Sequence, residues 1–280
     1  MTLAIVTATL DLTRALDCVL SWLRQARTDV RLVVVQQGAT DLSLALPRFT
    51  CVHAPEILGV VPAFALGVQK ALEEGADIVA CLHDDLLIEQ DGWDLAVQQA
   101  FNHPTVGLVG FGGALGLGDA DLYRKPYDPM QLARKDFVSN MRDAEAHGRR
   151  VTTTTRVSCL DGFSQIGRRE FWLGQHRTRM EYHDSAGSGP YANLFSIMQE
   201  LGVRHHWYDG ALGCYATRLG WETWMLPIAC HHFGGRTAVG DARYQEWART
   251  QTPAGDAGFW EQAHKWGYGY FRDCLPLRVP

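Results

Sequence analysis

Short apolar runs alternate with segments of helical periodicity over the first hundred residues. Residues 3–7 and 30–35 are rich in Leu, Ile and Val, as expected of buried strands. Between them, residues 12–26 carry apolar side chains at positions 15, 16, 19, 20 and 23, which is the stripe of an amphipathic helix. Repeated strand–helix–strand units of this length predict an α/β protein with a mainly parallel sheet and helices on both faces.

The same alternation continues further along the chain. Strands are expected at 50–53, in the apolar run of the segment 75–85 and at 105–111, and helices at 62–74 and 93–101. By contrast, residues 112–118 contain too many glycines for a stable element, and their spacing does not match a dinucleotide-binding fingerprint. Charged residues dominate the stretch 125–150, which we interpret as a helical or mobile excursion from the sheet or as a plain surface connection.

Composition limits the classes of protein to which the chain can belong. It has 280 residues, of which 46% are hydrophobic and 20% charged, an ordinary globular balance. The net charge of −5 gives no reason to expect a nucleic-acid partner. No apolar run is long enough to span a bilayer, and the seven cysteines form no CxxC pair. We therefore expect a cytoplasmic protein with reduced cysteines, either soluble or held peripherally at the inner face of the membrane.

The segment from Gly75 to Asp85 is the main candidate for chemistry. An apolar run, short enough for a buried strand, ends in the adjacent carboxylates of Asp84 and Asp85. In α/β proteins, ligands bind at the carboxyl ends of the strands. Two neighbouring carboxylates repel each other unless a cation neutralises them, and their oxygens suit Mg²⁺ or Mn²⁺. A solvated turn or a helix N-cap is the alternative interpretation.

Several segments follow one another in an order that resembles nucleotide-sugar glycosyltransferases of the GT-A fold. The chain is most similar to glycosyltransferase family 2, a large inverting group, over about residues 1–235. In that family an apolar strand ends in a DxD metal motif, which the stretch from Cys81 to Asp85 resembles. The other matching segments are Ser21-Trp22-Leu23, 35–41, 58–63, Asp161-Gly162-Phe163 with 168–171, and 231–235.

The resemblance implies one compact domain with two functional halves. Residues 1–110 would form the half that binds the nucleotide sugar within a Rossmann-like GT-A sheet. Residues 111–280 would form the acceptor-side half with an aromatic-rich C-terminal extension. The donor implied is a nucleoside-diphosphate sugar, with UDP favoured, and the acceptor is a glycan, a lipid-linked molecule or another glycoconjugate. Homo-oligomerisation stays open.

Site residues are implied by the positions that match the family pattern. Asp85 would bind Mn²⁺ or Mg²⁺ directly, with His232 or His231 as the second ligand. The chain departs from the pattern at the first DxD position, which is His83, and at the early acidic turn, which holds glutamines. An amide can still hydrogen-bond a base edge. The residues implied for donor binding are Thr7, Gln36, Gln37, Asp84 and Arg168.

The catalytic base is the position where the chain departs most from the family. The acidic pair that normally opens the late helix is replaced by Pro190 and Tyr191. The nearest upstream acid is Asp184, which we take as the candidate base, with Asp161 as the alternative. If neither reaches the acceptor, a retaining mechanism or an inactive protein that binds sugar nucleotides becomes the interpretation. A nucleotidyltransferase is a further alternative, but residues 7–10 lack the glycine-rich basic loop that it needs.

Overall fold

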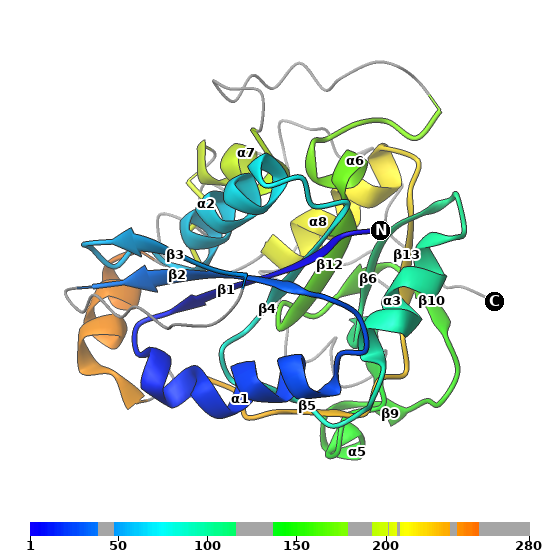
Figure 1. The fold of residues 1–280 in the computed structure, drawn as a ribbon, viewed down its shortest axis with the longest axis horizontal. Coiled ribbons are helices and arrows are strands. Elements are labelled where there is room, and N and C mark those ends of the chain that lie inside the picture. The colour runs from blue at the N-terminus through cyan, green and yellow to red at the C-terminus, as the bar shows by residue number, and fades with distance from the viewer. Residues whose placement is uncertain are drawn as a thin grey trace, which may run out of the picture.

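The fold is built on one large sheet that draws strands from both halves of the chain (Figure 1). The computed structural model describes residues 1–38, 48–115, 137–178, 192–200, 202–205, 208–235 and 240–251. Eight strands form the large sheet: β1 (Leu3–Thr9), β2 (Arg31–Gln37), β3 (Phe49–Ala54), β4 (Ile78–Leu82), β6 (Val106–Gly110), β10 (Thr155–Val157), β12 (Ser164–Arg168) and β13 (Glu222–Met225).

The strand order is β10-β13-β6-β12-β4-β1-β2-β3. Strands β3, β2, β1 and β4 run parallel to one another, as do β13 and β6. Strand β12 runs antiparallel to both of its neighbours, β4 and β6, and β10 lies antiparallel at one edge. The predicted α/β class with a mainly parallel sheet is therefore confirmed. Most predicted strands agree with the observed ones to within one or two residues.

Helices cover both faces of this sheet (Figure 1). Alternate residues of β4 show why, because Val79 and Cys81 belong to the apolar core under α2, α7 and α8, whereas Ala80 and Leu82 face the core under α1 and α3. The helices are α1 (Leu12–Gln25), α2 (Val60–Glu73), α3 (Trp93–Phe101), α5 (Ala144–His147), α6 (Arg169–Trp172), α7 (Leu194–Glu200) and α8 (Tyr208–Arg218).

Local sequence signals set the ends of the first two helices. The carboxylate of Asp11 accepts the backbone N–H of Thr13 at 3.0 Å, so α1 begins with an N-cap. Gly59 precedes α2 with a φ of 92°, and Gly75 follows it with a φ of 82°. Such positive angles are costly for residues with a Cβ atom, and glycine at both ends therefore delimits α2.

Two small sheets complete the fold. The prediction that residues 112–118 form no stable element is wrong for the first three, because β7 pairs with β8 and β11. A Cβ atom at Gly112 would lie 2.7 Å from the Phe137 ring, so glycine permits this close packing. The strands of the small sheets are β5 (Leu86–Ile88), β7 (Gly112–Ala114), β8 (Phe137–Ser139), β9 (Arg149–Arg150), β11 (Cys159–Leu160) and β14 (Cys230–His232).

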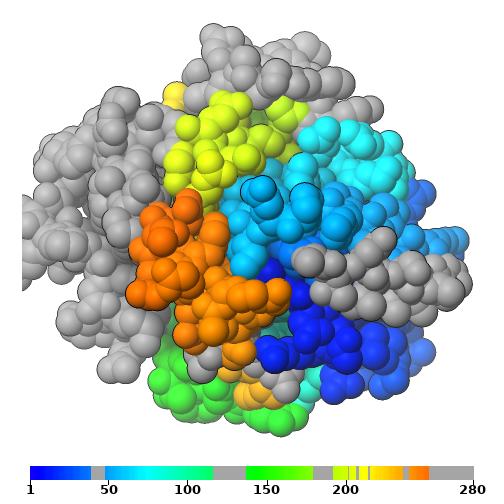
Figure 2. All heavy atoms as spheres, turned by 90° about the vertical axis from the view of Figure 1, so that its left-hand side faces the viewer, coloured from blue at the N-terminus to red at the C-terminus, as the bar shows by residue number. Residues whose placement is uncertain are grey.

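The segment 240–251 (orange) lies at the end of the sheet toward which β1, β2 and β3 run (Figure 1), and Figure 2 shows it against atoms of the amino-terminal half. Its Trp247 ring packs over Gly59 at the start of α2, where an added Cβ atom would lie 2.2 Å from the indole. The hydroxyl of Tyr244 lies 2.6 Å from Nδ1 of His205. Across the described ranges, no helix combines the length and the apolar character that a membrane span requires.

Candidate metal centre and its surroundings

The turn after β4 presents the candidate metal-binding side chains. It closes with a hydrogen bond from the backbone N–H of Leu86 to the carbonyl of His83, at 3.1 Å. The backbone N–H of His83 donates to the carbonyl of Phe163, which continues the pairing of β4 with β12. The turn is therefore held on two sides, and the side chains of His83 and Asp85 leave it in fixed directions.

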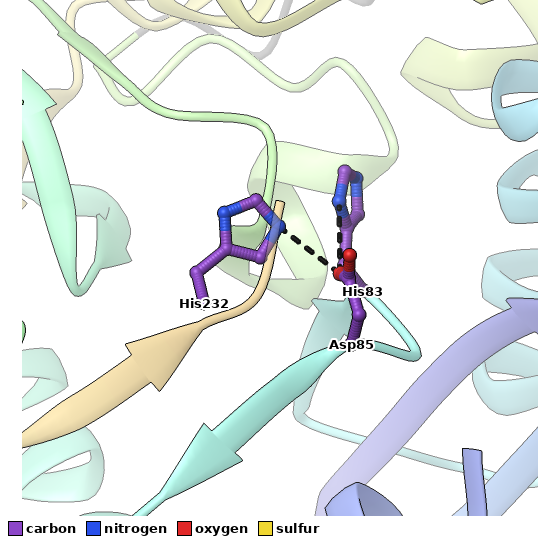
Figure 3. A group of neighbouring side chains, drawn as sticks. All are labelled: His83, Asp85 and His232. Atoms are coloured by element: carbon purple, nitrogen blue, oxygen red, sulfur yellow. Dashed lines mark ion pairs between the residues drawn. The ribbon is translucent and has the colours of Figure 1, made fainter. Parts of the chain in front are cut away.

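Pairing of β14 with β5 brings in the third side chain. His232 lies opposite Leu86 in this antiparallel pair, one residue beyond Asp85. The backbone N–H of Phe233 donates to the carbonyl of Asp85 at 3.1 Å. Figure 3 shows that the His232 ring, on β14, and the Asp85 carboxylate, in the turn before β5, point toward each other.

His83, Asp85 and His232 form one compact cluster of potential ligand atoms. One nitrogen or oxygen atom from each lies within 4.8 Å of the other two. Oδ1 of Asp85 lies 3.0 Å from Nε2 of His232 and 4.0 Å from Nδ1 of His83 (Figure 3). The Asp85 side chain is only 6% exposed, so its charge is shielded from water. Two imidazoles and one carboxylate can hold a divalent metal with positions left open.

The approach of His232 to Asp85 fits a metal between them better than a direct hydrogen bond. Nε2 of His232 is buried and, within the described part of the chain, has no hydrogen-bond partner of acceptable geometry. It nevertheless lies 3.0 Å from the carboxylate. A buried nitrogen left in this state is costly, and coordination of a cation would satisfy it. The donor set therefore fits a divalent metal.

Electrostatics shifts the pKa values of the two histidines in opposite directions. Burial, followed by repulsion from His232, lowers the pKa of His83 to about 4, although the charges of Asp85 and Asp161 oppose this shift. Burial also acts to lower the pKa of His232, but its contact with Asp85 outweighs this effect and raises the pKa. His83 is thus neutral at neutral pH and has a lone pair available for a metal.

A hydroxyl group behind the cluster holds His83 in place. Nε2 of His83 lies 2.6 Å from the hydroxyl of Tyr208, which donates to the carbonyl of Gly162 at 3.0 Å. Tyr208 is buried at the start of α8. A Cβ atom at Gly162 would lie 2.3 Å from that hydroxyl, so the contact requires glycine.

His231 is separated from the cluster by the alternation of side chains along β14. Its Nδ1 atom lies 3.9 Å from Oδ1 of Asp143, and its ring meets Phe233 edge-on. Successive side chains of a strand point to opposite faces, so only one member of the histidine pair can face Asp85. The structure places His232 there and leaves His231 on the other face.

Two carboxylates lie near the cluster on the side of α8. Asp161, one residue before Gly162, is close enough to His83 and His232 to influence both pKa values. Asp209, in the first turn of α8, accepts the backbone N–H of Gly210 at 2.8 Å. Burial, together with the charge of Asp161, raises the pKa of Asp209 to about 6. Sequence reasoning overlooked Asp209, although an acid at the start of a helix followed by Gly210 was a readable signal.

Three residues that the family resemblance implies for donor binding lie near the carboxyl ends of β1 and β2: Thr7, Gln36 and Gln37. Thr7 and Gln36 are buried, and their Oγ1 and Oε1 atoms have no hydrogen-bond partner among the residues that the structure describes. Gln37 instead accepts the backbone N–H groups of Leu58 and Gly59, at 2.8 and 3.0 Å, and so holds the loop before α2. Its amide oxygen is thus already engaged in structure.

Asp84 is close enough to Tyr244, in the segment 240–251, for its charge to influence the tyrosine. Burial raises the pKa of the Tyr244 hydroxyl, and the charge of Asp84 adds to this effect. The two adjacent carboxylates of the turn therefore have different neighbours. Asp85 belongs to the histidine cluster, whereas the charge of Asp84 acts on Tyr244. Asp184 lies outside the described residues.

Arg168 occupies the opposite end of the sheet from the cluster. It pairs with Ile78 at the start of β4, whereas Ser164 pairs with Leu82 next to the turn, roughly 13 Å away for a strand of this length. Its guanidinium donates to the carbonyls of Phe101, His103 and Val106 and packs against the Phe101 and Trp221 rings. This position does not place Arg168 beside the other residues implied for donor binding.

Comparisons with known proteins give a loose likeness in fold. No protein-family model and no curated protein sequence matches the chain. Mannosyltransferase PcManGT from Pyrobaculum calidifontis, solved with GDP-Man and Mn²⁺, is 13% identical, with 97% of this chain and 73% of that chain covered and a TM-score of 0.43. A197 from STIV is 12% identical, with coverage of 83% and 86% and a TM-score of 0.41. TarS from S. aureus is 11% identical, with coverage of 84% and 37% and a TM-score of 0.45.

Proposed function

We propose that this protein is a metal-dependent glycosyltransferase of the GT-A type, which transfers a sugar with inversion from a nucleoside-diphosphate sugar to a glycan or lipid-linked acceptor. The observation that carries the proposal is the convergence of His83, Asp85 and His232 at the end of a central parallel strand. Ligands of α/β proteins bind at this edge. The ordered motifs of the sequence supply the family assignment, and UDP is the favoured nucleotide.

The cluster would hold the metal, Mn²⁺ or Mg²⁺ in the family pattern. A bound divalent cation would neutralise the charge on the diphosphate leaving group. Asp85 supplies the buried negative charge that attracts the cation, and the two imidazoles supply neutral donors. Thr7 and Gln36, with buried polar atoms in need of partners, are the residues assigned to the nucleotide, and Asp84 is assigned to the donor sugar or ribose.

The proposed base is the carboxylate pair of Asp161 and Asp209. One of these accepts the proton of the acceptor hydroxyl as the hydroxyl oxygen forms a bond to the anomeric carbon. The bond from that carbon to the phosphate oxygen breaks, and its electron pair leaves with the nucleoside diphosphate. A pKa of about 6 for Asp209 places it near the ideal range for a base at neutral pH. Asp184 stays a candidate by sequence position alone.

A donor screen tests the function. Purified protein is incubated with UDP-, GDP- and other nucleotide sugars, with Mn²⁺ or Mg²⁺ and with metal chelated, and release of nucleoside diphosphate is measured. We expect metal-dependent release from one donor, which Asp161→Asn or Asp209→Asn reduces. Nuclear magnetic resonance of the anomeric proton in the product distinguishes inversion from retention.

Other outcomes of the screen would contradict the proposal. Donor binding in calorimetry without release or transfer would indicate an inactive protein that binds sugar nucleotides. Release of pyrophosphate from a nucleoside triphosphate and a sugar phosphate would indicate a nucleotidyltransferase.

A further inference from the structure

We propose that the metal centre binds through two imidazoles and one carboxylate, with His83 as a ligand through Nδ1, and therefore prefers a first-row transition metal such as Mn²⁺ or Co²⁺ over Mg²⁺. In this assignment Tyr208 is the positioning residue that presents Nδ1 of His83. The inference deepens the proposed function and rests on it for the presence of a metal. It concerns a position at which this chain departs from the DxD pattern.

Hydrogen bonding fixes which nitrogen of His83 carries the proton. The Tyr208 hydroxyl lies 3.0 Å from the carbonyl of Gly162 and 2.6 Å from Nε2 of His83. A hydroxyl has one hydrogen, and a carbonyl can only accept, so the Tyr208 hydrogen goes to Gly162. Both contacts are satisfied only if Nε2 of His83 donates to the tyrosine oxygen. Nδ1 then carries a lone pair.

That lone pair lies on the side of the cluster. Nδ1 of His83 is 4.0 Å from Oδ1 of Asp85, which itself lies 3.0 Å from Nε2 of His232. Metal-bound histidines usually donate their other ring N–H to an oxygen that sets the orientation of the ring. Tyr208 provides this oxygen from a buried position at the start of α8. His83 therefore has the arrangement of a ligand rather than of a side chain that merely fills space.

The chemistry of the three donors determines the preferred metal. Mg²⁺ is a hard ion that takes oxygen ligands and gives up water reluctantly, so two neutral nitrogens suit it poorly. Affinity of a mixed nitrogen and oxygen site rises along the first transition series from Mn²⁺ through Co²⁺ to Cu²⁺, and imidazole suits the later ions of that series best. Three protein ligands also leave positions for water and for the oxygens of a diphosphate.

Electron paramagnetic resonance of Mn²⁺ tests this ligand set without an activity assay. Metal-free protein is titrated with Mn²⁺, whose free signal disappears on binding, and Mg²⁺ is then added as the competitor. Spin-echo modulation of the bound ion detects nitrogen from coordinated imidazole. We expect weak competition by Mg²⁺ and two coordinated nitrogens in the wild type.

Three variants separate the roles of the residues. His83→Asp should lose one of the two nitrogen signals and shift the preference toward Mg²⁺. Tyr208→Phe should weaken Mn²⁺ binding by roughly 10- to 100-fold, the usual effect of removing a partner of a ligand. Tyr215→Phe removes a hydroxyl from a buried tyrosine of the same helix and should leave Mn²⁺ binding unchanged. Thermal unfolding of each metal-free variant checks that it folds.

Equal affinities of the wild type for Mg²⁺ and Mn²⁺ would overturn the inference, as would unchanged nitrogen signals in a folded His83→Asp variant. Equal effects of Tyr208→Phe and Tyr215→Phe would remove the positioning role of Tyr208.

These failures differ from failure of the proposed function. Turnover of a nucleotide sugar with Mg²⁺ and Mn²⁺ bound equally well would leave the glycosyltransferase standing, whereas selective Mn²⁺ binding without any turnover would leave only the metal centre.

Discussion

Oδ1 of Asp85 lies 3.0 Å from Nε2 of His232, and this contact joins the turn after β4 to a strand from the other half of the chain. Pairing of β14 with β5 places His232 next to Asp85. The site is therefore a product of tertiary structure, and its parts can be tested separately.

Asp85→Asn removes the buried charge and keeps the shape of the side chain. We expect kcat/KM for release of nucleoside diphosphate to fall roughly 100-fold or more, because a fixed charge that stabilises the leaving group is lost. Steady-state kinetics at saturating Mn²⁺ measures this loss. Asp91→Asn, which removes an exposed carboxylate paired with Arg27, is the matched control and should behave as the wild type. An Asp85→Asn variant with normal kinetics would show that Asp85 is not a metal ligand.

The neighbouring histidines of β14 offer a matched pair of variants. His232→Ala should raise the Mn²⁺ concentration needed for half-maximal turnover by at least roughly tenfold, the loss seen when even an outer partner of a metal ligand is removed. His231→Ala should not, since its ring faces Asp143. Metal titrations of activity compare the two. The reverse result would make His231 the ligand.

Asp209 should leave a signature in the pH dependence of stability. Its pKa is raised from 3.8 to about 6, first by burial and then by Asp161, so between these values the folded state binds more protons than the unfolded state. The free energy of unfolding therefore decreases as pH rises through this window. Asp209→Asn cannot titrate and should be more stable than the wild type at neutral pH. Urea unfolding at about pH 4 and about pH 7 measures both proteins, and parallel changes in the two would refute the shift.

Alanine substitutions at two glycines with positive φ distinguish the effect of backbone strain alone from the effect of strain combined with a steric clash. Gly38 has a φ of 89° with no atom within 4 Å of an added Cβ, so Gly38→Ala should cost only about 1–2 kcal/mol. Gly59 has a φ of 92°, and an added Cβ would meet the Trp247 ring at 2.2 Å. Gly59→Ala should therefore also displace the segment 240–251. Limited proteolysis should cut this segment faster in Gly59→Ala only, and equal cleavage in both variants would argue against the contact.

A substitution of Arg168 tests whether this residue stabilises the fold or binds the donor, the role that the family resemblance implies for it. Arg168→Met should lower the free energy of unfolding by roughly 1–3 kcal/mol. The backbone carbonyls of Phe101, His103 and Val106 would lose their charged hydrogen-bond donor. The KM for the nucleotide sugar should not change. Denaturant unfolding and donor kinetics on the same preparation give both values. A raised KM at normal stability would return Arg168 to the donor site.

Local pattern was sufficient to predict the first half of the fold. Strands β1, β2 and β4 are largely apolar runs, and α1 and α2 have caps or glycines at their ends, so periodicity and end signals agree. It failed at β7, where Gly112 and Gly113 have poor strand propensity. Close packing against Phe137 and Phe163 selects glycine there, and no local signal shows that.

Only the part of the candidate site that combines a motif resemblance with the end of an apolar strand could be predicted from the sequence. Asp85 and His232 follow from the family pattern, and the structure brings them together. His83 was noted as an irregularity, and its ligand geometry depends on Tyr208, far away in the sequence. Arg168 shows the opposite case. The antiparallel strand β12 carries it to the end of the sheet opposite the cluster of His83, Asp85 and His232, and no local signal in the sequence shows the direction of that strand.

The antiparallel strand β12 also governs the order in which the protein can fold. It fills the space between β4 and β6, which belong to the first 110 residues, yet it ends only at Arg168. During synthesis, β4 would wait with one edge unpaired and β6 with both, because the neighbours of β6 in the sheet, β12 and β13, are made later. Such distant pairing slows folding, and exposed edges invite aggregation. A fragment that stops at residue 110 should therefore aggregate rather than fold.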